Sequence, residues 1–263
     1  IETRAGLLIL KVEATLTNAI PNFTIKYDPK VTSDEFIEAA IACSLKCSNP
    51  AICNHQANLP TYGEEYGISS CYNILPIQGG AYSLTRLTLT HLAKEAKSID
   101  QFLNELLPDA LSCIADYLNE RIDFQVEKLG FFESNFLVKE GLLSKDRFVA
   151  MFGVTGMAEG VNTLLKDKGL IYGKDEEAND LATTILDIIQ SFIDETEAHY
   201  SPLSNNRFVL HAQVGLDSDI GVTSGVRIPV GDEPENFIDH LNHSAKYHKY
   251  FPSGVGDIFP IAT

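Results

Sequence analysis

The chain has 263 residues, of which 44% are hydrophobic and 21% charged, so it is long enough for a sizeable core and typical of an ordinary globular protein. Its 36 acidic and 20 basic residues give a net charge of −16, which argues against non-specific nucleic-acid binding because that needs a cationic face. No apolar run approaches the roughly 18 residues that cross a bilayer, and the start has no signal-peptide pattern. We therefore expect a cytoplasmic protein that binds neither membranes nor nucleic acids.

The first fifty residues predict two strands and one helix. The continuous apolar run at residues 6–11 is typical of a buried strand, and residues 22–27 alternate apolar and polar side chains as a half-buried strand does. Ser33, which precedes two acids, is a typical helix N-cap, and Asn49-Pro50 is expected to end that helix.

Residues 54–83 interrupt this regular pattern. The segment is rich in glycine, proline and tyrosine, and it contains Cys71. We predict a long, ordered loop, and long irregular loops inside compact domains are usually functional.

Three helices are expected after this loop. Apolar residues from Leu84 to Glu95 recur at intervals of three and four, and Ser98 to Gln101 has the pattern of a capping box. The helix that starts there should run to about Phe124, with Pro108 interrupting or restarting it. The clearest amphipathic pattern covers residues 175–199, where one face is apolar and the other acidic.

The last third of the chain returns to strand patterns. A glycine-punctuated apolar stretch, 153–160, leads into a helix, and residues 207–214 and 221–230 predict strands. This order of elements suggests part of a large α/β barrel rather than a complete doubly wound sheet. The chain begins at Ile1 and ends just after the apolar run 258–261, so we expect a piece of a longer protein, the alternative being a processed domain.

The cysteines predict free thiols. There are five, an odd number, and without a signal peptide this composition favours a reducing compartment. Cys43, Cys47 and Cys53 have a spacing that fits no common zinc site, so we expect them to bind no metal and form no disulfide. Cys113 lies in an apolar helical pattern and is expected in the core.

Cys71 is the strongest candidate for chemistry. It lies within the Gly/Pro-rich loop, and it could serve as a nucleophile, a redox thiol, a radical carrier or a packed loop cysteine. A thiolate nucleophile requires a nearby cation or helix N-terminus, which no sequence neighbour obviously supplies. A Cys–His hydrolase remains open, because His55 or His211 could approach the thiol in space.

Other polar residues stand out by their context. Glu159 is a lone carboxylate in the glycine-rich apolar stretch, so it is either paired or faces a cavity. Arg227 alternates with apolar neighbours and points into the barrel if those neighbours pack on outer helices; otherwise it forms a surface ion pair. His240 and His243 are only weakly metal-like in spacing, and we expect surface histidines.

Three segments together resemble the glycyl-radical enzymes. The loop at 70–73, Ser-Cys-Tyr-Asn, and the segment 84–89 resemble the finger loop of that superfamily and the helix start after it. Residues 152–159 resemble a downstream glycine-containing stretch, and residues 248–257 resemble a late segment before the radical domain. The resemblance is strongest to the YjjI-type family, which is similar to pyruvate formate-lyase and anaerobic ribonucleotide reductase.

The resemblance implies a fold and a chemistry. Residues 1–263 would be one catalytic portion of a ten-stranded α/β barrel, with residues 54–83 as the central finger loop and residues 175–199 as an outer helix. No metal or permanently bound cofactor is expected. The glycyl radical would lie on a part of the protein absent from this chain, since none of its glycines lies in an Arg-Val-x-Gly-Tyr loop. A radical-SAM activating enzyme and a second copy of the chain are the implied partners.

The same resemblance implies roles for site residues. Cys71 would become a thiyl radical that abstracts hydrogen from a small anionic or polar substrate. The implied substrate-binding residues are Tyr72, Asn73, Glu159, His211 and Arg227. Two alternatives stay open: a non-radical binding or scaffold domain in which Cys71 is structural, and a thiol enzyme of ordinary polar mechanism.

Overall fold

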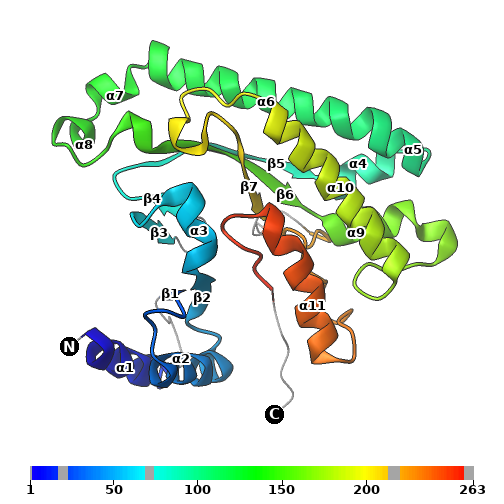
Figure 1. The fold of residues 1–263 in the computed structure, drawn as a ribbon. Coiled ribbons are helices and arrows are strands. Elements are labelled where there is room, and N and C mark those ends of the chain that lie inside the picture. Colours follow the sequence, from blue (N-terminus) through cyan, green and yellow to red (C-terminus); the bar gives the residue numbers. More distant parts are fainter. Residues whose placement is uncertain (1, 17–22, 69–73, 213–219, 258–263) are drawn as a thin grey trace. The chain divides into compact units, whose positions relative to one another are not determined.

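The structure is a computed structural model that describes residues 2–16, 23–68, 74–212 and 220–257 (Figure 1). Its described residues form two compact units, 2–64 and 65–257. Each unit has its own hydrophobic core. Cys71, Tyr72 and Asn73 lie outside the described residues, so the loop that was expected to carry the thiol stays a prediction.

The first unit combines helices with a parallel pair of strands. Its elements are α1 (Glu2–Glu13), β1 (Thr24–Tyr27), α2 (Asp34–Cys47), β2 (Ala51–Asn54) and α3 (His55–Tyr62). β1 and β2 pair in parallel, which confirms the strand expected near residues 22–27. The Ser33 side chain accepts a hydrogen bond from the Phe36 amide, as expected of the N-cap of α2.

The strand expected at residues 6–11 is wrong, because this run lies inside α1. Leu10 is buried with Ala40 and Cys43 of α2, whereas Leu8 and Ile9 are exposed. Burial on one side only is what a helix packed on a single neighbour produces, and a short apolar run cannot distinguish this from a buried strand.

The long irregular loop expected over residues 54–83 is also wrong for its described part. This part contains α3 and the antiparallel strands β3 (Tyr66–Ile68) and β4 (Ile74–Pro76). The Asn54 side chain caps α3 by accepting from the Ala57 amide. Gly79 permits a close approach of chains, because a Cβ there would overlap the Arg147 carbonyl. Gly63 caps the end of α3, but Pro60 lies inside α3 and Gly67 inside β3, so only some of these glycines and prolines mark boundaries between short elements.

A parallel sheet forms the centre of the second unit. Its strands are β5 (Gly80–Thr88), β6 (Phe148–Thr155) and β7 (Val209–Ala212), in the order β5-β6-β7. The helix expected from Leu84 is therefore corrected: residues 84–88 belong to β5, and α4 covers only Leu89–Glu95. Pairing with β6 overrides the helical spacing, because residues 84–88 gain a full ladder of hydrogen bonds there.

Helices cover one face of this sheet (Figure 1). A continuous helical stretch consists of α5 (Ile99–Gln101), a π-helical segment (Phe102–Leu106), α6 (Leu107–Asp123) and a second π-helical segment (Phe124–Lys128). Ser98 caps it as expected, accepting from the Gln101 amide. Pro108 does not interrupt it, because it lies at the start of α6, after the π-helical segment, where a missing N–H is tolerated.

The amphipathic helix expected at 175–199 is confirmed as α10 (Glu176–Glu195). It packs with α6 on the sheet and contributes buried Ile185 and Ile189 to the core. The other helices of this unit are α7 (Phe131–Ser134), α8 (Phe136–Lys139), α9 (Met157–Leu164) and α11 (Phe237–Tyr247). Short 3-10 turns cover Lys145–Arg147, Lys166–Lys168, Pro202–Ser204 and His248–Tyr250.

The sheets of the described chain are small. They are the three-stranded sheet and two pairs of strands, so the architecture is mixed α/β and a ten-stranded barrel is not shown. The strand expected at 221–230 is wrong. The Thr223 and Gly225 carbonyls in this segment accept from the amides at the start of α9 instead of from a neighbouring strand. Within the described part of the chain, no helix is both long and apolar enough to cross a membrane.

Among the described residues, Cys43, Cys47, Cys53 and Cys113 form no disulfide. The sulfurs of Cys43 and Cys47 lie 3.7 Å apart, and Cys43 is buried. Cys113 is exposed on α6, so its expected place in the core is wrong. It lies between the core positions Leu111 and Ala115, and so on the solvent side of the helix.

Burial should make Cys43 unreactive. Burial, together with the neighbouring Cys47, raises the pKa of the Cys43 thiol to about 11, and only the thiolate is nucleophilic. We expect iodoacetamide at about pH 8 to label exposed Cys113 at least about tenfold faster than Cys43. Peptide mass spectrometry over time measures both rates in one sample, and the two should converge in urea. Equal rates in the folded protein would contradict the burial of Cys43.

Candidate functional site

The two faces of the parallel sheet differ in chemistry. Side chains of Phe152 and Val154 in β6, with Leu210 in β7, join the core under the helices. Successive side chains of a strand point to opposite faces, so Gly153 and His211 face away from the helices. All eight residues of β6 are buried, so this second face is shielded from water along the central strand.

A row of three residues crosses the second face. Arg86 of β5 pairs with Gly153 of β6, and Gly153 pairs with His211 of β7. Paired residues of neighbouring parallel strands point to the same side, so the guanidinium and the imidazole flank a position that carries no side chain. The row therefore places a cation and an imidazole on either side of a position that has no side chain of its own.

His211 is held neutral. The side chain is 1% exposed, and burial lowers its pKa to about 4. Neither ring nitrogen has a hydrogen-bond partner in the described structure. At neutral pH the ring thus has one N–H to donate and one nitrogen to accept with. Buried polar groups are normally paired, so this unpaired imidazole is a candidate contact for a ligand.

Glu159 lies in the first turn of α9, beside the carboxyl end of β6. Its Oε1 accepts from the backbone amide of Thr223, at 2.9 Å, and from the Thr223 hydroxyl. Its Oε2 is buried without a partner among the described residues. One carboxylate oxygen is thus paired, as the first interpretation of the sequence expected, whereas a cavity beside Glu159 stays a prediction.

The segment 222–228 crosses the carboxyl ends of β6 and β7. The Thr155 hydroxyl and the Gly156 amide both donate to the Thr223 carbonyl. A Cβ on Gly225 would lie 3.1 Å from that of Ala212, next to His211 in β7. The structure therefore brings Glu159 and this segment together at the edge of the sheet where parallel α/β folds place ligands.

Arg227 belongs to the same segment. Its two neighbours, Val226 and Ile228, are buried in the core, while Arg227 is half-buried. Burial therefore alternates from Val226 to Ile228 as expected, although this segment is not a strand. Its Nε is buried and has no hydrogen-bond partner among the described residues. Because Cys71 lies outside the described residues, a common cavity for Cys71, Glu159 and Arg227 stays a prediction.

His240 and His243 are not surface residues, which corrects the sequence-based expectation. They are 2% and 4% exposed. His240 Nε2 lies 3.1 Å from Asp257 Oδ2, which also accepts from the Ser244 hydroxyl. Both histidines lie on the inner side of α11, three residues apart, as do core positions of an amphipathic helix. No group of three or more metal-binding side chains occurs among the described residues.

Sequence reasoning missed Arg86 as a site residue. The motif at 84–89 was noticed, but its helical interpretation hid the alternation that separates Arg86 from buried Leu87. The alternation of polar Arg86 and Thr88 with apolar Leu87 was the available signal. As a set, a cation, a neutral imidazole and an unpaired carboxylate oxygen can bind and orient a small polar substrate and exchange protons with it.

The fold is similar to that of solved structures of another protein. It is similar to that of the anaerobic ribonucleotide reductase, with a TM-score of 0.67 at 15% identity over 97% of this chain and 43% of that one. The Thermotoga maritima anaerobic ribonucleotide reductase in complex with dATP and CTP gives a TM-score of 0.67 at 16% identity, over 97% of this chain and 46% of the other. At such low identity, these comparisons establish likeness of fold alone.

The family of this chain is established by its sequence. The model of the family described as "Glycyl radical enzyme YjjI-like" matches residues 1–263, and the chain belongs to that family. An uncharacterized protein of Haemophilus influenzae is 43% identical over 98% of this chain and 51% of its own length. Escherichia coli YjjI, also uncharacterized, is 39% identical over 96% of this chain and 49% of its own. The chain thus spans about half the length of the curated relatives that it matches.

Proposed function

We propose that this chain is the catalytic portion of a glycyl-radical enzyme whose substrate chamber is walled by the sheet face that carries Arg86 and His211. Family membership supports the enzyme class. The observation that supports a chamber at this face is the row in which Arg86 and the unpaired, neutral His211 flank Gly153. In this proposal β5, β6 and β7 are three strands of a larger barrel that the rest of the protein completes.

The proposed chemistry is a relay of hydrogen atoms. The stored glycyl radical supplies the oxidising equivalent: it accepts the hydrogen atom of the Cys71 thiol, which leaves a thiyl sulfur. The thiyl then takes a hydrogen atom from a substrate carbon, which re-forms the S–H bond and leaves a substrate radical. Such species are quenched by oxygen and by stray thiols, and the buried, apolar surroundings of β6 are suited to exclude both.

The charges of the second face favour a small anionic or polar substrate. Arg86 can bind a carboxylate or phosphate group through two parallel hydrogen bonds, and Arg227 is a further candidate at the edge of the sheet. His211 can orient a hydroxyl or carbonyl without adding charge, because its pKa of about 4 keeps it neutral. Tyr72, Asn73 and Glu159 complete the proposed binding set. A radical-SAM activating enzyme and a second copy of the chain are the proposed partners.

Isotope exchange tests this relay without knowledge of the substrate. A thiol hydrogen exchanges with solvent, so in D₂O the Cys71 thiol becomes S–D. Transfer of this deuterium to the glycyl radical, followed by return of the original glycine hydrogen to sulfur, leaves deuterium on the radical glycine. The intact protein is activated anaerobically and followed by electron paramagnetic resonance. We expect the splitting from the glycine hydrogen to collapse in the wild type and to persist in Cys71→Ala.

Cys113→Ala is the matched control for this experiment. Cys113 is a free thiol exposed on α6, so its removal should leave the exchange unchanged. Collapse of the splitting in Cys71→Ala would show that another thiol relays the hydrogen. Failure to generate any radical in the intact protein would favour a binding or scaffold domain instead.

A further inference from the structure

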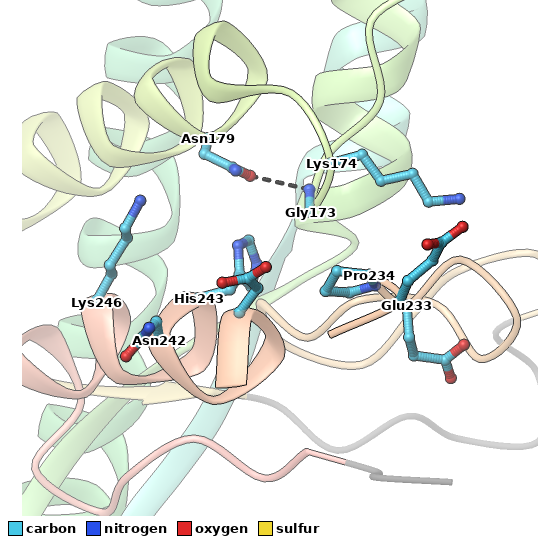
Figure 2. A pocket seen from close by; sticks show the side chains of 10 residues that line it. Gly173, Lys174, Asn179, Glu233, Pro234, Asn242, His243 and Lys246 are labelled. Atoms are coloured by element: carbon cyan, nitrogen blue, oxygen red, sulfur yellow. Dashed lines mark hydrogen bonds between the residues drawn. The ribbon is translucent and has the colours of Figure 1, made fainter. Parts of the chain in front are cut away.

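A second cavity lies away from the proposed chamber. It has a volume of about 560 Å³ and opens between α11, the turn before α10 and the loop at 231–235 (Figure 2). This volume is typical of sites for small organic ligands. The cavity shares no lining residue with the row of Arg86, Gly153 and His211, so a ligand bound in it would not depend on the proposed function.

The inner wall of the cavity contains an unpaired histidine. His243 projects from α11 toward the turn before α10 (Figure 2), and its side chain is 4% exposed. The rings of Tyr172 and Tyr247 pack edge-on against it, with centroids 4.7 and 5.1 Å away. Neither ring nitrogen has a hydrogen-bond partner in the described chain. Burial, as the largest cause, lowers the pKa of this ring to about 4, so at neutral pH one nitrogen is an acceptor.

A carboxylate on the loop at 231–235 is fixed by one oxygen only. Glu233 Oε2 accepts from the Gly231 amide at 2.7 Å, which orients the side chain. Glu233 Oε1 is buried and has no partner among the described residues. The opposite turn is fixed as well, because Asn179 Oδ1 accepts from the Gly173 amide at 2.9 Å (Figure 2). Glu233 Oε1 is therefore a hydrogen-bond acceptor that is held in place and lacks a donor.

The charges around the cavity favour a cation. Three carboxylates line it, those of Glu233, Glu235 and Asp239, against the two ammonium groups of Lys174 and Lys246. The ammonium of Lys174 also lies 3.9 Å from an Asp232 carboxylate oxygen, which offsets its charge. A carboxylate-bearing or phosphate-bearing ligand would meet a surplus of negative charge here.

We propose that this cavity binds a small organic cation, an amine or guanidinium carried on a short aliphatic body, with Glu233 Oε1 and His243 as its hydrogen-bond acceptors. The charged head would donate to both buried acceptors, and hydrogen bonds between ionised groups are the stronger kind. The body would lie in the remainder of the cavity, because a volume of about 560 Å³ exceeds what the head alone requires.

Calorimetric titration of the intact protein tests the proposal. Agmatine and spermidine are the probes, and glutarate of comparable length is the anionic comparison. We expect saturable binding of at least one cation and none of glutarate. Glu233→Gln should weaken cation binding at least about tenfold. Glu195→Gln removes an equal charge from the exposed far end of α10 and should leave it unchanged.

A second measurement is independent of the variants. Ring resonances of His243 should shift on addition of the bound cation in the wild type, which keeps the test valid if Glu233→Gln fails to fold. Equal affinities of the two variants would assign the binding to the general negative charge of the protein and overturn the site. So would preference for glutarate, an unmoved His243 resonance, or no saturable binding of either cation below about 1 mM.

Discussion

Replacing Gly156 by alanine should lower the free energy of unfolding by about 3 kcal/mol. Gly156 precedes α9 with φ of +72°, a conformation that costs a residue with a Cβ about 1 kcal/mol or more. The space is also filled: a Cβ there would overlap Thr90 Oγ1 and lie 3.1 Å from Val222 Cγ1. The Thr90 hydroxyl donates to the Gly156 carbonyl, so the clash falls on the contact that joins α4 to the start of α9.

Gly169→Ala is the matched control for this substitution. Gly169 has nearly the same φ, +66°, but nothing lies within 4 Å of a Cβ built there, so only the backbone cost of about 1 kcal/mol remains. Urea unfolding of both variants measures the difference. Thr90→Ala combined with Gly156→Ala should recover part of the loss. Equal destabilisation at the two glycines would contradict the packing around Gly156.

Mild acid should destabilise the protein through two buried histidines. Burial lowers the pKa values of His211 and His243 to about 4, against about 6.5 in the unfolded chain. Below pH 6.5 the unfolded state binds protons that the folded state does not, so stability falls as the pH drops from 6.5 toward 4. At about pH 5 each histidine should cost about 2 kcal/mol relative to neutral pH.

Unfolding in urea at about pH 7.5 and about pH 5 checks this expectation. His211→Phe and His243→Phe each remove one titrating ring and keep a buried aromatic, so each should reduce the pH-dependent loss by about 2 kcal/mol. Met151→Leu, buried in β6 two residues from Gly153, removes no titrating group and should leave the difference between the two pH values unchanged. An unaltered pH dependence in both phenylalanine variants would show that these rings are accessible to protons.

Family motifs and local signals were readable from the sequence. The caps at Ser33 and Ser98 depend on a side chain and an amide three residues on, and both are present. The amphipathic pattern of α10 is long enough to exclude a strand. The motif around Cys71 and the glycine stretch at 152–159 led to the glycyl-radical class, and the family match confirms it. Each of these signals is contained within one continuous segment of the chain.

Features that depend on contacts between residues far apart in the sequence were decided only by the tertiary structure. Residues 6–11 form a helix where a strand was expected, because they pack on α2 with one side only. Residues 84–88 form a strand where a helix was expected, because their hydrogen-bond ladder with β6 outweighs short-range propensity. The row of Arg86 and His211 joins residues 125 positions apart in the chain, and only strand register puts them on one face. The burial of His240 and His243 likewise depends on which side of α11 meets the core. Sequence determined the class and the local turns of this chain, whereas long-range pairing and burial determined which side chains face the proposed chamber and the second cavity.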